Sequence, residues 1–233
     1  MKNRVQIALF SYNFPHKKTQ DFIYRLVSEG VNIGVIFAAD PVKLNIKKSS
    51  VKTKINHGAL IHPKIIAKNL SIKYVVTKHD DHKLIKKMMG DIEIGVISGA
   101  RIIKENVIKL FKKGIINFHP GIIPNARGLD SLLWSILNFE PLGVTAHLIE
   151  PKIDAGKILK SKKIPIFKND SIFEISERLN ELQVSMLVDA IFLTMENSFF
   201  KLNDYGSYNK KMDNELELKA INNLNKYLEK YAE

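Results

Sequence analysis

Residues 114–124 read Gly-Ile-Ile-Asn-Phe-His-Pro-Gly-Ile-Ile-Pro, an apolar strand that runs into a loop fixed by two prolines and a glycine. Side chains alternate along a strand, so Asn117 and His119 point to one face of the sheet and Phe118 to the other. An amide and an imidazole therefore leave the strand together at its C-terminal end. Because ligands of open α/β sheets bind at that end, we expect a functional site here. The alternative is a polar strand end with a solvated histidine.

The sequence before this motif alternates between strands and helices. Apolar runs predict strands over 4–11, 31–38, 72–76 and 92–98, and apolar residues at helical spacing predict helices between them, the first from about Gln20 and the last over 103–113. Such alternation is typical of βαβ units. We therefore predict an α/β fold with one Rossmann-like domain, in which a mainly parallel sheet carries helices on both faces.

Two further parts of the chain complete this picture. The Lys- and Ser-rich segment 41–60 has no clear period and is expected to be a surface excursion. After the motif we expect a helix over 129–138, two neighbouring strands over 143–149 and 157–166, and a long helix opened by a capping box at 171–174.

Composition limits the class of protein. The 233 residues fit one domain with a small appendage, and there is no cysteine to form disulfides or thiolate metal sites. No apolar run is long enough to span a membrane, and the N-terminus enters a strand directly, so a soluble cytoplasmic protein is expected. The net charge of +12 suggests nucleic acid, but the lysines are spread along the whole chain, and nucleic-acid binding is not expected.

A set of motifs in the central part of the chain resembles a known family. Asn117-Phe118-His119 is followed by Pro124 and Arg127-Gly128, then by Gly-Val-Thr-x-His at 143–147 and Asp-x-Gly-x-Ile-Leu at 154–159. In order and spacing these elements resemble the folate-dependent formyltransferases, over roughly residues 85–195. The resemblance implies a catalytic domain over 1–198 and a short helical C-terminal extension over 199–233. A last amphipathic helix in that extension either packs on the domain or contacts a second copy in a homodimer.

The resemblance also implies the site residues and the co-substrate. Asn117, His119 and Asp154 correspond to the family's catalytic triad, and the formyl donor is 10-formyltetrahydrofolate. Asn117 would donate to the oxyanion, His119 would donate to the same oxygen or accept the proton of the amine, and Asp154 would orient His119. The remaining candidates are cofactor-binding Gly99, Ala100, Ile102 and Ile153, and substrate-binding Arg127, Thr145 and His147.

The acceptor amine is predicted from departures from the family pattern. Residues 11–16, after the first strand, lack the glycine-rich phosphate loop of glycinamide ribonucleotide enzymes, and the length leaves no room for the C-terminal domain of methionyl-tRNA enzymes. His-Pro-Gly at 119–121 resembles the nucleotide-sugar N-formyltransferases. A nucleotide-linked amino sugar of the O-antigen type, with dTDP as the nucleotide, is therefore the expected acceptor.

Other functions remain open or are excluded. The ribonucleotide, methionyl-tRNA and a non-catalytic folate-binding role are the alternatives. A Rossmann oxidoreductase would need Gly-x-Gly-x-x-Gly after the first strand, and the sequence has none. His-Asp-Asp-His at 79–82 looks like part of a metal site, but no second cluster completes it, so no metal is expected.

Overall fold

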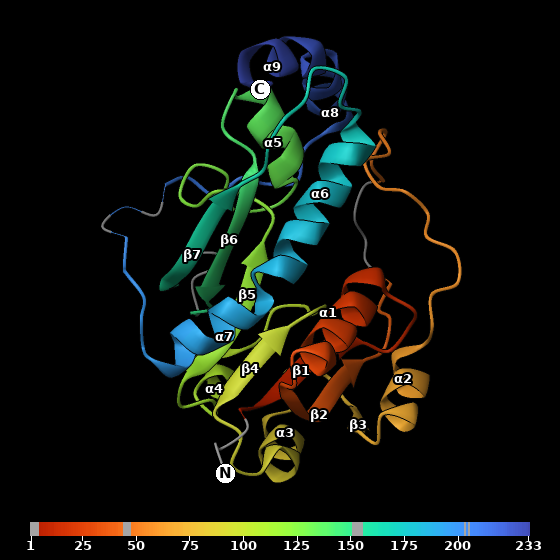
Figure 1. The fold of residues 1–233 in the computed structure, drawn as a ribbon, viewed down its shortest axis with the longest axis vertical. Coiled ribbons are helices and arrows are strands. Elements are labelled where there is room, and N and C mark those ends of the chain that lie inside the picture. Colours follow the sequence, from red (N-terminus) through yellow and green to blue (C-terminus); the bar gives the residue numbers. More distant parts are fainter. Residues whose placement is uncertain (1–4, 44–47, 151–155, 203, 205) are drawn as a thin grey trace.

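The computed structural model describes residues 5–43, 48–150, 156–202, 204 and 206–233, and shows one mixed sheet with helices on both faces (Figure 1). The strands are β1 Gln6–Tyr12, β2 Asn32–Ala39, β3 Lys73–Val76, β4 Ile94–Ile97, β5 Gly114–His119, β6 Gly143–Leu148 and β7 Ile158–Lys163. The helices are α1 Lys17–Ser28, α2 Pro63–Asn69, α3 His82–Met89, α4 Glu105–Ile108, α5 Ser131–Leu137, α6 Ile172–Ser185, α7 Leu187–Met195, α8 Asn214–Asn222 and α9 Leu224–Tyr231.

The sheet has the order β3-β2-β1-β4-β5-β6-β7. The pairs from β3 to β5 are parallel, whereas β5–β6 and β6–β7 are antiparallel. The expected mainly parallel sheet is thus confirmed, and strand order reverses between β1 and β4. The C-terminal ends of these strands and of β5 form the edge where α/β folds bind ligands.

Each face of the sheet has its own apolar core. Side chains of α1, α2, α5, α6 and α7 pack on one face with residues such as Ile7, Leu9 and Phe118. Side chains of α3 and α4 pack on the other face with residues such as Phe10 and Ile115. Because neighbouring strand residues point to opposite faces, an uninterrupted apolar run such as β4 serves both cores.

Two helix predictions need correction. The helix expected over 103–113 is a single turn, α4, which ends at Ile108. It ends early because Phe111 packs against Phe10, with 5.6 Å between the ring centroids. Helix α1 begins at Lys17, three residues before the expected start at Gln20. The long helix opened by the Ser171 capping box is confirmed as α6, which ends at Ser185 and is followed by α7 from Leu187.

The end of the chain packs on the sheet domain. Helices α8 and α9, expected as one helix, lie beside α5 at one end of the molecule (Figure 1). Tyr227 on α9 is fully buried, and its hydroxyl donates to the Glu140 carbonyl at 2.9 Å. In the described part of the chain, none of the helices has the length and apolarity that crossing a membrane requires.

Candidate functional site

The polar residues of the motif lie together at the end of β5. In the β5–β6 register Asn117 pairs with His147, and His119 pairs with Thr145. Directly opposite residues of an antiparallel pair share a face, so these four side chains form one polar patch. Phe118, between them, points to the opposite face and packs edge-on against Phe22 of α1, 5.3 Å between centroids.

Asn117 is held by a histidine from the next strand. Its Nδ2 donates to Nε2 of the fully buried His147 at 3.2 Å. An amide nitrogen carries two hydrogens, so one N–H serves His147 and the other is available for a ligand. The structure thus gives His147 a positioning contact with Asn117, and its expected contact with the substrate stays a prediction.

His119 is oriented by the loop that follows it. Its Nε2 lies 2.6 Å from the carbonyl oxygen of Ala126. A carbonyl only accepts, so Nε2 carries the hydrogen, and the basic lone pair of a neutral ring is on Nδ1. Gly121 permits this fold of the loop, because a Cβ there would lie 2.9 Å from His119 Nε2 and 2.7 Å from the Ala126 oxygen.

Thr145 holds the same loop. Its hydroxyl donates to the Gly121 carbonyl at 2.8 Å and accepts from the Ile123 N–H at 3.1 Å. The residue is fully buried and is not among the described residues that line the cleft beside His119. The structure therefore gives Thr145 a loop-positioning contact where the sequence predicts a substrate contact.

A cleft of about 680 Å³ opens beside His119. Three segments far apart in the sequence form its walls: the start of α1, the irregular segment before α2, and the turn that leads into α5, with α6 between them. The lining residues that matter for its chemistry are His16, Lys18, Lys54, His57, His119 and Asp130. The segment 41–60, expected as a surface excursion, thus supplies part of this cleft.

Lys18 is the most perturbed charge in the cleft. Its Nζ donates to the Phe118 carbonyl at 3.2 Å, between Asn117 and His119 in the chain. Burial, together with the charge of Lys54, lowers the pKa of Lys18 to about 7. Nearby, burial and the charges of Lys18 and Lys54 lower the pKa of His16 to about 4, so His16 is neutral at physiological pH. The cleft therefore disfavours additional positive charge and suits an anion.

Arg127 lies away from this cleft. It is only 5% exposed, and its Nη1 donates to the Gly206 carbonyl at 3.4 Å. Its guanidinium also lies 5.6 Å from the centroid of the Tyr208 ring. Arg127 thus joins the loop after β5 to the C-terminal segment. No motif or spacing in the sequence predicts that Lys18 and Lys54 line the cleft.

The loop expected to bind the cofactor follows β4. A Cβ on Gly99 would lie 2.7 Å from the Tyr12 ring, whose hydroxyl donates to the Ala100 carbonyl at 3.1 Å. Tyr12 therefore occupies the space beside Gly99 that was expected to receive a ligand. Ile102 is 72% exposed and presents an apolar surface. Ile153, the fourth expected cofactor-binding residue, and Asp154, the third expected catalytic residue, lie outside the described residues.

Neither histidine of the 79–82 sequence shares a metal site with described neighbours. Nε2 of His79 lies 3.1 Å from the Phe37 carbonyl, and the Asp81 side chain caps α3 through the Leu84 N–H at 3.0 Å. Within the described ranges, no group of three or more His, Asp or Glu side chains is arranged to hold a metal ion.

Comparison with known proteins gives the same family as the motifs. Residues 82–191 match the family model described as formyl transferase. The chain is 31% identical over 145 residues to methionyl-tRNA formyltransferase of Ehrlichia ruminantium, a match covering 62% of this chain and 46% of that protein. The chain spans less than half of the length of the first curated relatives that it matches.

Solved structures show the same fold at low sequence identity. Glycinamide ribonucleotide transformylase 1 of Symbiobacterium toebii is 14% identical with a TM-score of 0.64, covering 84% of this chain and 90% of that one. The formyltransferase PseJ of Anoxybacillus kamchatkensis is 20% identical with a TM-score of 0.57, covering 91% of this chain and 89% of that one. Residues 82–191, which contain Asn117 and His119, thus match the formyl transferase family model, and the chain shares its fold with these enzymes.

Proposed function

We propose that this protein transfers a formyl group from 10-formyltetrahydrofolate to the amine of a nucleotide-linked amino sugar. The observation that carries the proposal is that His119 lines a cleft which also presents Lys18 and Lys54. A group suited to proton transfer and a pair of cations suited to phosphate thus face the same space.

The reaction requires a nucleophile, a proton acceptor and a donor to the oxygen that becomes negative. The acceptor nitrogen adds to the formyl carbon and a new C–N bond forms, while the carbonyl oxygen gains the electron pair. The bond between the formyl carbon and N10 of the folate then breaks, N10 takes a proton, and the acceptor nitrogen loses one. No covalent bond to the protein is needed.

The geometry supports separate tasks for the two motif residues. The second N–H of Asn117 would stabilise the oxyanion, and loss of one such donor typically costs about 3 kcal/mol of transition-state stabilisation. Nε2 of His119 already donates to Ala126, so the base role on Nδ1 is favoured over a second oxyanion contact. Asp154 would act once Nδ1 has taken the proton, as the carboxylate that stabilises the charged His119 ring and accepts from Nδ1–H.

The acceptor is proposed from charge and from the loop after β1. In that loop Tyr12 and Phe14 stack at 5.0 Å, and the Asn13 side chain is bonded to Asp40 at 2.6 Å and to Tyr74 at 2.7 Å. These side chains fill the place where a phosphate cradle of backbone N–H groups would be needed. Lys18 and Lys54 are therefore the proposed partners of a sugar diphosphate, in place of Arg127. The PseJ structure, solved with a UDP-linked formamido sugar and tetrahydrofolate, supports this acceptor class.

The folate is assigned to the loop after β4. The exposed side chain of Ile102 and the backbone of Ala100 would contact the flat pteridine, because such rings are bound mainly by apolar surface and backbone groups. We keep residues 1–198 as the catalytic domain and 199–233 as its extension.

The test is turnover with three acceptors. Purified protein is given 10-formyltetrahydrofolate with a dTDP-amino sugar, glycinamide ribonucleotide or methionyl-tRNA, and tetrahydrofolate release is followed. We expect formylation of the sugar alone. Formylation of either other acceptor in place of the sugar would refute the acceptor, and folate binding without turnover of any acceptor would favour a binding module.

The residues are tested by His119→Ala and Asp154→Asn. Each is expected to keep the thermal melting temperature and to lose most of kcat, whereas His82→Ala on α3 should retain both. A variant that unfolds but keeps its activity per folded molecule would assign that residue to structure.

A further inference from the structure

One wall of the acceptor cleft has no regular structure of its own. Residues 48–62 contain no helix or strand, yet Thr53, Lys54, Ile55 and His57 from this segment line the cleft. A segment without backbone ladders keeps a defined position only through side-chain contacts. We call residues 48–57 the outer wall, and residues 128–133, all of which line the cleft, the inner wall.

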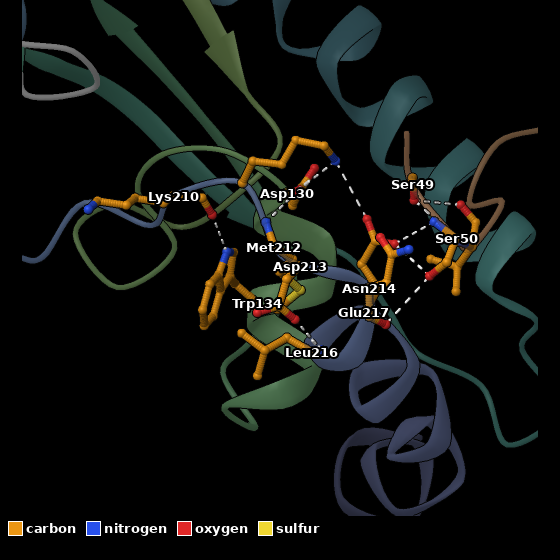
Figure 2. A network of polar contacts seen from close by, with 12 residues as sticks. Ser49, Ser50, Asp130, Trp134, Lys210, Met212, Asp213, Asn214, Leu216 and Glu217 are labelled. Carbon is orange, nitrogen blue, oxygen red and sulfur yellow. Dashed lines mark hydrogen bonds and ion pairs between the residues drawn. The ribbon is translucent and has the colours of Figure 1, made fainter. Parts of the chain in front are cut away.

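The outer wall is fastened near its start by a buried carboxylate from α8. One carboxylate oxygen of Glu217 accepts from the backbone N–H of Ser50 at 2.7 Å and from its hydroxyl at 2.9 Å (Figure 2). Glu217 is only 1% exposed. Burial by itself would raise the pKa of Glu217, but hydrogen bonds from Ser49 and Ser50 outweigh burial and lower this pKa. The carboxylate is therefore charged at neutral pH.

Residues just before Glu217 in the chain hold the inner wall. Lys211 Nζ lies 3.5 Å from the second oxygen of Glu217 and 3.4 Å from Oδ2 of Asp130. That Asp130 oxygen also accepts the N–H of Met212 at 2.9 Å, and the Trp134 indole donates to the Lys210 carbonyl at 2.9 Å (Figure 2).

Backbone bonds add to this attachment. Asn209 donates to the Arg127 carbonyl and accepts from the Leu129 N–H, each at 2.9 Å. One short stretch, residues 206–217, therefore contacts both walls, which are about 80 residues apart in the sequence.

We propose that residues 206–217 form a strap that fixes the distance between the two walls, with Glu217 and Lys211 as positioning residues for acceptor binding. Neither side chain lines the cleft among its described lining residues, so they act through Ser50 and Asp130. The identity of the acceptor rests on the proposed function, whereas the mechanical role of the strap does not.

The first experiment uses trypsin and needs no substrate. Glu217→Gln removes the charge; its carbonyl oxygen can still accept from Ser50, but its N–H₂ group cannot accept from Lys211. Cleavage after Lys52 and Lys54 should become about tenfold faster, because loss of a charge-assisted bond changes a local opening equilibrium by about that factor. Cleavage after Lys86 and Lys87 in α3, on the other face of the sheet, should not change. The matched control is Glu215→Gln, an exposed residue in the same first turn of α8.

A second variant tests the contact from the other side. Ser50→Ala removes the hydroxyl bond at an exposed residue and should speed cleavage at Lys52 and Lys54 in the wild-type background, and by less in the Glu217→Gln background, where the hydroxyl no longer meets a charged acceptor. Faster cleavage at all four lysines would show general destabilisation and overturn the proposal. Rates equal to wild type in Glu217→Gln would overturn it equally.

The kinetic experiment tests the link to the acceptor. Glu217→Gln should raise the KM for the acceptor about tenfold with kcat near that of the wild type, the reverse of a His119 variant. If trypsin cleaves the outer wall of Glu217→Gln faster but the KM for the acceptor is unchanged, the positioning role is refuted. If wild type turns over no acceptor, the proposed function fails, while the trypsin result still decides whether the strap exists.

Discussion

Lys18 gives the sharpest test of the electrostatic account of the cleft. Its pKa falls from the ordinary value of 10.5 to about 7 on folding. Each unit corresponds to about 1.36 kcal/mol, so at pH 6 the protonated amine opposes folding by about 5 kcal/mol. Lys18→Met removes this opposition but loses the bond to the Phe118 carbonyl, which costs about 2 kcal/mol. The variant should therefore be more stable than wild type by about 3 kcal/mol at pH 6.

The sign of the pH dependence follows from the lowered pKa. The unfolded chain binds more protons at this group between pH 7 and 10.5, so the penalty is full below pH 7 and declines as the pH rises. At pH 9 about 2 kcal/mol of it remains, which the lost hydrogen bond cancels. The advantage of Lys18→Met at pH 6 should therefore vanish near pH 9.

The assay is urea denaturation of wild type and variant at pH 6 and pH 9, with melting temperatures as a second measure. About 3 kcal/mol corresponds to a rise of roughly 6–12 °C for a chain of this size. Lys17→Met is the control, because Lys17 is partly exposed and pairs with Asp21 at 2.7 Å, and its effect should stay within about 1 kcal/mol at both pH values. A Lys18→Met protein less stable than wild type at pH 6, or an equal difference at both pH values, would refute the reasoning.

Two further predictions concern the scaffold of the site. Asp170 is buried and bound to Arg178 by two bonds of 2.8 Å, so Asp170→Asn should cost roughly 2–3 kcal/mol in urea denaturation at pH 7. Hydrogen bonding to Arg178 lowers the pKa of Asp170, so this contribution is lost as the pH falls through the folded pKa, below the ordinary 3.8; an unchanged difference at pH 3 would contradict the assignment. Gly128 has φ +105°, and a Cβ there would lie 2.3 Å from the Asn209 oxygen, so Gly128→Ala should cost about 3 kcal/mol and release residues 206–212. Gly58→Ala, with nothing within 4 Å, is its control and should change stability by less than about 1 kcal/mol; equal effects would refute the close approach.

The centre of the sheet was predictable because β1, β2 and β4 are apolar on both faces, which leaves a clear signal in the sequence. The prediction that Asn117 and His119 point to the same face of the sheet follows from the alternation of side chains along a strand alone. Helix ends were less predictable: α4 stops after one turn because Phe111 must reach Phe10, a contact between residues 101 positions apart. No local pattern contains such a constraint.

The cleft was less predictable than the motif for a related reason. Lys54 lies in a segment with no period, and its position depends on Ser50 meeting Glu217, 167 residues later in the chain. Arg127 is expected to meet an anion because it follows the motif closely, and its described side-chain contacts are with Gly206 and Tyr208. Sequence proximity to a motif thus predicts membership of the loop, whereas the contacts of a side chain depend on residues far away in the chain.

Helix α1 shows how the cleft and the motif are connected physically. Lys18 donates to the backbone of Phe118, and Phe22, one turn later, packs edge-on against the Phe118 ring. One helix therefore contacts both the backbone and the side chain of the residue between Asn117 and His119. An anion near Lys18 would draw its proton equilibrium toward the charged form, which strengthens a bond to a carbonyl. Lys18 and the two polar motif residues are therefore connected through the backbone of Phe118. Replacing Lys18 consequently alters the support of the site as well as its charge.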